Sequence, residues 1–129
     1  MYQISILTGD RVLREQLRNW VLDGFARWEL APALEAPEDL VPFYYRFRDA
    51  PSDLVVLALP GVAGLNAAEH LRDLCPDCGL VWCSDLDFSL QAYRLRADYF
   101  ILGPSTQEKL HTGLTRWLET RAQDDRRRM

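Results

Sequence analysis

The sequence predicts a single α/β domain built on a five-stranded parallel sheet with helices on both faces. Segments with strand character alternate five times with segments of helical periodicity, which is the pattern of a parallel sheet with crossover helices. Residues 53–59 and 78–84 are nearly continuous apolar runs, as expected for strands covered on both faces. The length of 129 residues favours one domain, with a core that needs no metal or disulfide.

The chain opens with an expected strand and helix. Residues 2–8 (YQISILT) are short, apolar and rich in β-branched side chains, which predicts a strand. Gly9 ends this strand, and Asp10 is placed to cap the next element. Residues 12–25 carry apolar side chains at helical spacing and predict an amphipathic helix.

The next stretch predicts a second strand and a second helix, both with a proline. Residues 27–34 predict a strand in which Pro32 indicates an edge or a bulge. Residues 36–49 predict a helix that Pro42 weakens in its middle.

The second half of the chain repeats the alternation of strands and helices after the strand at 53–59. We expect, in order, a helix, a strand, a helix, a strand and a long helix at residues 64–74, 78–84, 87–96, 98–102 and 105–122. Ser105 is the expected cap of the last helix. We place the domain at residues 1–121 and expect residues 122–129 to be a polar tail or the start of a linker.

Composition excludes several classes of function. Three cysteines, an odd number, argue against a disulfide framework. The net charge of −4 makes this domain alone a poor nucleic-acid binder, because phosphate contacts need a basic face. No apolar run approaches the roughly 20 residues that cross a bilayer, and the first residues lack a secretory-signal pattern, so we expect a cytoplasmic protein without membrane contact.

In open parallel sheets, ligands bind beyond the carboxyl ends of the strands. The strand ends of this chain are Thr8-Gly9, Ala58-Leu59, Cys83-Ser84 and Leu102-Gly103. The long apolar strand at 53–59 therefore carries, near its end, an alanine with no chemical function.

These strand ends and the segments around them resemble the receiver domain of bacterial response regulators, and the class with a LytTR-type DNA-binding domain above all. The resemblance is carried by ISILTGDRVLREQL, SDLVVLALPGVAGL, VWCSDLDFSLQAYRLRADYFILGP and STQEKLHTGLTRWLE. It spans residue 3 to about residue 120 and is weakest between residues 26 and 50. It implies the flavodoxin-like (βα)5 fold with strand order 2-1-3-4-5.

The resemblance also marks the positions of a phosphorylation pocket. These positions are Thr8, Gly9, Asp10, Ala58, Cys83, Ser84, Gly103 and Pro104. The family's acidic pair falls on Thr8 and Gly9, so that only the following acid, Asp10, remains. The phosphorylated Asp falls on Ala58, the family's Ser/Thr on Cys83, and the Lys on Gly103. Receivers tend to have a cis bond before the proline, which implies one at Gly103-Pro104.

The chemistry of a receiver is missing at these positions. Phosphoryl transfer needs a carboxylate nucleophile, several oxygen ligands for Mg²⁺ and a cation over the transferring oxygens. Ala58 offers no lone pair, Asp10 alone cannot hold the metal, and Gly103 has no charge. The sequence therefore predicts a pseudo-receiver: no enzyme, no metal and no cofactor, but a module of signal transduction or transcriptional regulation that acts through protein contacts.

In receivers, the fourth helix, fifth strand and fifth helix form the face that pairs with another receiver or an output domain. The resemblance implies a partner face of Tyr93, Arg94, Asp98, Phe100, Lys109 and Trp117, for a protein partner or a second copy. The helix at 36–49 departs most from the family and is either a second contact surface or a distorted helix that packs normally.

Other functions remain open. The pocket could be rebuilt for a small molecule, with the hydroxyls of Thr8 and Ser84 and free backbone N–H groups as ligands. A reactive Cys83, or a Cys75/Cys78 pair that is redox-active or binds metal with His70, would make the protein an enzyme or a metal binder. Asp85 and Asp87 either cap the next helix or place acids beside the pocket.

Overall fold

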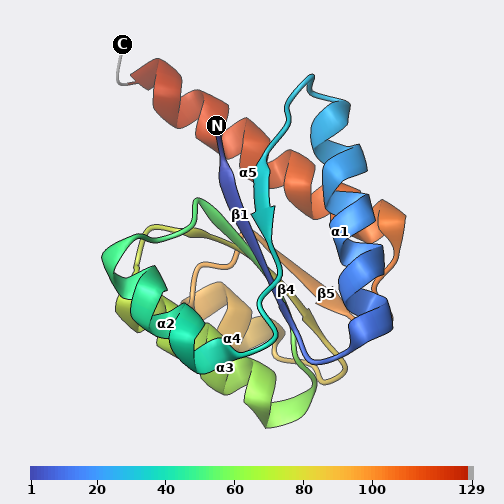
Figure 1. Ribbon diagram of the computed structural model, residues 1–129, viewed down its shortest axis with the longest axis vertical. Coiled ribbons are helices and arrows are strands. Elements are labelled where there is room, and N and C mark those ends of the chain that lie inside the picture. Colours follow the sequence, from blue (N-terminus) through green and yellow to red (C-terminus); the bar gives the residue numbers. More distant parts are fainter. Residues whose placement is uncertain (128–129) are drawn as a thin grey trace.

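The computed structural model describes residues 1–127 and confirms the predicted fold. Across these residues the chain forms one parallel sheet in the order β2-β1-β3-β4-β5. The strands are β1 Gln3–Thr8, β2 Ala33–Glu35, β3 Leu54–Ala58, β4 Gly79–Ser84 and β5 Tyr99–Leu102. The helices are α1 Arg11–Ala26, α2 Leu40–Asp49, α3 Gly61–Leu74, α4 Ser89–Arg94 and α5 Gln107–Arg127. Helices α1 and α5 cover one face of the sheet, and α2, α3 and α4 cover the other (Figure 1).

Strand β3 lies in the middle of the sheet and is buried on both faces. Leu54, Val56 and Ala58 belong to the core beneath α1 and α5. The alternate residues Val55 and Leu57 belong to the core beneath α2, α3 and α4. This explains the continuous apolar run, because both sides of the pleat face packed helices.

Trp117 anchors α5 to the sheet. It is only 3% exposed, and its ring packs edge-on against Tyr2, with the ring centroids 5.1 Å apart. It lies over Gly79, where a Cβ atom would collide with the indole ring. The prediction that Trp117 belongs to a partner face is wrong, because α5 turns this side chain towards the sheet.

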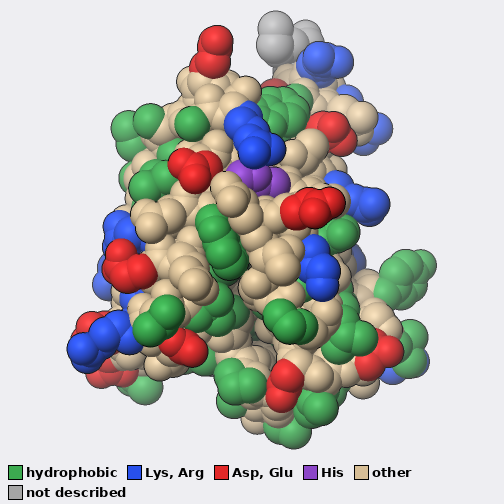
Figure 2. Space-filling model, turned by 90° about the vertical axis from the view of Figure 1, so that its right-hand side faces the viewer, with side chains coloured by type: hydrophobic (Ala, Val, Ile, Leu, Met, Phe, Trp, Pro, Cys, Tyr) green, Lys and Arg blue, Asp and Glu red, His purple; other side chains and the backbone are tan. Residues whose placement is uncertain are grey.

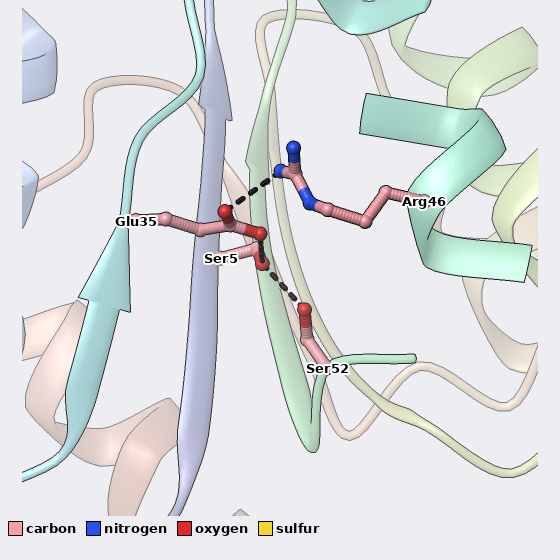
Figure 3. Close-up of polar contacts among 4 residues, drawn as sticks. All are labelled: Ser5, Glu35, Arg46 and Ser52. Atoms are coloured by element: carbon pink, nitrogen blue, oxygen red, sulfur yellow. Dashed lines mark hydrogen bonds and ion pairs between the residues drawn. The ribbon is translucent and has the colours of Figure 1, made fainter. Parts of the chain in front are cut away.

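The edge strand β2 is shorter than predicted and is tied to its neighbours by polar side chains. It pairs with β1 over three residues only. The hydroxyl of Ser5 donates to Glu35 at 3.0 Å and is hydrogen-bonded to Ser52, while Arg46 of α2 donates to Glu35 at 2.7 Å (Figure 3). The network joins β1, β2, α2 and the segment before β3, and so compensates for the short pairing.

Helix α2 begins later than predicted, which removes the expected conflict with Pro42. Asp39 caps the helix by accepting a hydrogen bond from Val41 N at 3.2 Å. Pro42 then lies in the first turn, where the backbone N–H has no partner within the helix.

Two expectations about the connection into α5 are wrong. Thr106, and not Ser105, caps the helix, because its Oγ1 accepts from Lys109 N at 3.2 Å. No cis peptide bond occurs within residues 1–127, so Gly103-Pro104 is trans. Gly103 has a φ of +88°, and the chain turns here through the conformational freedom of glycine.

Helix α5 continues without a break past residue 121 to Arg127. The boundary between a domain at 1–121 and a tail at 122–129 stays a prediction, and residues 128–129 lie outside the described part of the chain. None of the helices within residues 1–127 is long and apolar enough to cross a membrane.

The turn from α3 into β4 carries Cys75 and Cys78 as free thiols beside a buried arginine. Arg72 donates to the carbonyl oxygens of Leu95 and Cys78, each at 2.6 Å, and to that of Arg96 at 3.1 Å. Burial is the main cause that raises the pKa of Cys78 from 9.0 to about 12. The thiol is therefore protonated at neutral pH and a weak nucleophile.

We expect Trp117→Ala to lower the free energy of unfolding by about 3–5 kcal/mol, because it empties the space over Gly79 in the core. Trp28→Ala is the matched control: Trp28 is 40% exposed, and its loss should cost about 1 kcal/mol or less. Urea unfolding measures both. Equal losses in the two variants would contradict the packing described for α5.

In the folded protein, iodoacetamide at pH 8 should label the half-buried Cys75 first, and peptide mass spectrometry would locate the label. Cys78 and Cys83 should react only in urea, because burial excludes the reagent and raises both thiol pKa values. Labelling of Cys78 or Cys83 as fast as Cys75 would instead indicate a reactive thiol.

The thiol of Cys78 ionises near pH 9.0 in the unfolded chain and near pH 12 in the folded one. The free energy of unfolding should therefore fall as the pH rises above 9.0.

Candidate functional site

The carboxyl ends of β1, β3, β4 and β5 surround a hollow of about 580 Å³. The structure brings all eight predicted pocket positions together around it. The lining is Thr8, Gly9, Asp10, Leu13, Ala58, Leu59, Pro60, Cys83, Ser84, Asp85, Gly103, Pro104 and Ser105. Figure 2 keeps the vertical axis of Figure 1 and shows a hollow between hydrophobic side chains in the lower part of the molecule.

The end of β1 supplies one buried hydroxyl and one acid that caps a helix. Thr8 is buried, and its Oγ1 accepts a hydrogen bond from Asp10 N at 3.3 Å. As predicted, the carboxylate of Asp10 caps α1, because its Oδ1 accepts from Val12 N at 2.9 Å and from Leu13 N at 3.1 Å. This oxygen is therefore already engaged with the backbone.

The tip of β3 carries only a methyl group. Ala58 lies beside Thr8 in the register of the two strands and is 7% exposed. Among the lining residues, the charged side chains are Asp10 and Asp85, and none is Lys or Arg. The lining therefore offers a phosphate-like anion no cationic side chain, and the guanidinium of Arg14, just outside it, already donates to the carbonyl oxygen of Thr8 at 2.9 Å.

The end of β4 supplies a thiol and a hydroxyl. Burial raises the pKa of Cys83, and a hydrogen bond with Ser105 offsets this only in part. The hydroxyl of Ser84 accepts from Leu86 N at 3.1 Å. Neither group is activated as a nucleophile by these contacts.

Gly103 closes the hollow on the side of β5. Its N–H donates to the carbonyl oxygen of Ser84 at 2.9 Å, which fixes the turn after β5. A Cβ atom at this position would meet open space, yet the φ of +88° would strain any side chain placed there.

The two acids after β4 have different roles. Asp87 accepts from Ser89 N at 3.0 Å at the start of α4, and the hydrogen bonds from Ser89 lower its pKa. Asp85 lies at the hollow and accepts from Gly61 N, the first residue of α3, at 2.8 Å. Local sequence holds no signal for this contact, because the two residues are 24 positions apart.

The predicted partner face is only partly on the surface. Tyr93 is 82% exposed, and Arg94 and Lys109 are exposed as well. Phe100 packs edge-on against Trp82, with the ring centroids 5.3 Å apart, and Asp98 accepts from Leu80 N at 2.8 Å. Burial raises the pKa of Asp98. Its carboxylate thus lies partly inside the protein, where it pairs with the backbone of β4.

Sequence reasoning missed two exposed apolar side chains on α4 and β5. Leu90 lies three residues before Tyr93 on α4 and is 56% exposed, and Leu102 at the end of β5 is 47% exposed. Figure 2, which views the face of α1 and α5, shows Lys and Arg side chains interspersed with Asp and Glu on the described part of that face.

The alternative metal site with His70 is not formed in the structure. His70 packs edge-on against Tyr44, with the ring centroids 4.6 Å apart. Within residues 1–127, no group of three or more His, Cys, Asp or Glu side chains is arranged to hold a metal ion.

Comparisons of sequence reveal no relative: no protein family model matches the chain, and no curated protein matches it. Comparisons of structure give many matches, and several are receiver domains of response regulators. The receiver domain of AraT from Geobacillus stearothermophilus is 19% identical, with a TM-score of 0.76 over 96% of this chain and 98% of that one. A CheY-like receiver domain protein from Methanospirillum hungatei is 16% identical, with a TM-score of 0.75 over 96% and 98%.

A third similar structure is that of the response regulator TrrA from Thermotoga maritima, solved in complex with Mg²⁺-BeF. It is 20% identical, with a TM-score of 0.67 over 91% of this chain and 99% of that one. At these identities the likeness concerns the fold. The five-stranded sheet in the order 2-1-3-4-5 and its five helices give the described chain the flavodoxin-like fold of CheY-like receiver domains.

Proposed function

We propose that this protein is a pseudo-receiver, a signalling module that works through protein contacts and does not take up phosphate. The observation that carries the proposal is the hollow at the strand ends, where β3 ends in the methyl group of Ala58 and no lining residue is Lys or Arg. The sequence resemblance to the LytTR class favours a role in transcriptional regulation.

Three requirements of phosphoryl transfer are unmet at this site. Ala58 provides no nucleophile. Mg²⁺ needs several oxygen ligands in octahedral geometry, whereas Asp10 has an oxygen engaged with the start of α1. The negative charges of Asp10 and Asp85 oppose, and do not neutralise, the charge that develops on transferring oxygens.

Protein contacts are the remaining way for such a module to act. The exposed Tyr93 and Leu90 of α4 and Leu102 of β5 provide apolar surface, and the exposed Arg94 follows Tyr93 in the chain. Aromatic and arginine side chains of this kind are enriched where proteins bind one another. We propose a protein partner or a second copy on this face, in the cytoplasm, without cofactor, membrane or nucleic acid.

A second candidate function is the binding of a small molecule. The hollow of about 580 Å³ falls within the roughly 300–1,000 Å³ of typical ligand sites. The hydroxyls of Thr8, Ser84 and Ser105 line it and could orient a polar ligand. The charged side chains of its lining are Asp10 and Asp85, so neutral or cationic molecules suit it better than anions.

Incubation with acetyl phosphate and Mg²⁺, followed by intact-mass measurement, should show no phosphoryl adduct on this protein. Ala58→Asp should remain unmodified as well, because the acceptor returns without the metal ligands and the cation. A receiver that keeps its Asp, acidic pair and Lys serves as the positive control. A stoichiometric adduct on the unaltered chain would overturn the proposal.

A thermal-shift screen of nucleotides, amino acids and polyamines separates the two candidate functions. For the pseudo-receiver we expect an unchanged melting temperature with every compound. A saturable rise would favour the second candidate if Ala58→Phe, which fills the hollow at the strand tip, abolishes it.

A further inference from the structure

The start of α3 is capped by a side chain from another loop. Asp85, the residue after β4, accepts a hydrogen bond from Gly61 N at 2.8 Å. The residue before Gly61 is Pro60, which gives α3 no side-chain cap of its own. Gly61 has a φ of +63°, a left-handed conformation that glycine adopts without strain.

This contact differs from the other caps of the chain. Helices α1, α2 and α5 are capped by Asp10, Asp39 and Thr106, each of which directly precedes its helix. The cap of α3 comes from 24 positions further along the chain. This hydrogen bond therefore pairs the N–H of Gly61 at the start of α3 and also links the β3–α3 loop to the β4–α4 loop.

Both loops border the hollow at the strand ends. The first turn of a helix leaves N–H groups unpaired and carries partial positive charge, so an anion is favoured there. In this chain a carboxylate from the opposite loop already takes that place. The loop that supplies it leads directly into α4, which carries the exposed Leu90 and Tyr93.

We propose that Asp85 is an internal latch: its carboxylate takes the anion position at the start of α3 and holds the two loops, and α4 behind them, in one arrangement. The two pocket loops are thereby joined without any external anion. This link between the two loops requires neither phosphate uptake nor a bound partner.

Hydrogen exchange followed by mass spectrometry on the full chain tests the latch. In Asp85→Ala, we expect amide exchange to become about fivefold faster both in residues 59–63 and in residues 86–95, as for the loss of a helix cap. In Asp85→Asn, an oxygen acceptor remains, and the acceleration in both segments should be clearly smaller. Asp87→Ala is the matched control, since the hydrogen bond of Asp87 goes to Ser89 N at the start of α4, and it should leave residues 59–63 unchanged.

Three results would overturn the proposal. They are unaltered exchange of both segments in Asp85→Ala, acceleration confined to residues 86–95, and an equal effect of Asp87→Ala on residues 59–63. Circular dichroism establishes that each variant is folded. If Asp85→Ala fails to fold, Asp85→Leu takes its place, because it also removes the acceptor: acceleration in both segments supports the latch, and no acceleration in either refutes it.

Discussion

The structure depends on the burial of one strand, Leu54–Ala58, on both of its faces. This central strand pairs with β1 on one side and β4 on the other, and its side chains divide between two separate cores. Helices must therefore cover both faces of the sheet, and polar groups can gather only at its edges. At the carboxyl ends of the strands, where a receiver has its chemistry, this chain has a hollow in which β3 contributes the methyl group of Ala58 and no lining residue is Lys or Arg.

The residues around that hollow form a consistent set. Clustered carboxylates repel one another and are costly to desolvate unless a cation lies between them. When the metal and the Lys are absent, small neutral residues such as Ala58 and Gly9 remove this cost. The two acids that remain, Asp10 and Asp85, are each engaged with the N-terminus of a helix. Each charge is thus partly offset by the backbone N–H groups and the dipole of the helix that it caps.

The fold could be predicted because its signals are local. Apolar runs marked β3 and β4, helical periodicity marked α1, and the Asp10 cap followed from its position before α1. The wrong expectations concern features that depend on contacts between residues far apart in the sequence. Trp117 is buried because α5 packs over Gly79, a contact between residues far apart in the chain. The bond Gly103-Pro104 is trans, where the resemblance to receivers implied cis. The contact of Asp85 with Gly61 N joins two loops that no local pattern connects. The eight pocket positions came from the family resemblance, and their common location follows from the parallel sheet.

The central claim is that the framework of a phosphate switch is present in this chain without the groups that hold the metal. Titration of the ¹⁵N-labelled protein with Mg²⁺, observed through backbone amide resonances, tests this claim most directly. We expect that the amides of Gly9, Asp10, Ala58 and Leu59, which line the hollow, do not shift at physiological concentrations of the ion. A saturable shift confined to these amides would contradict it.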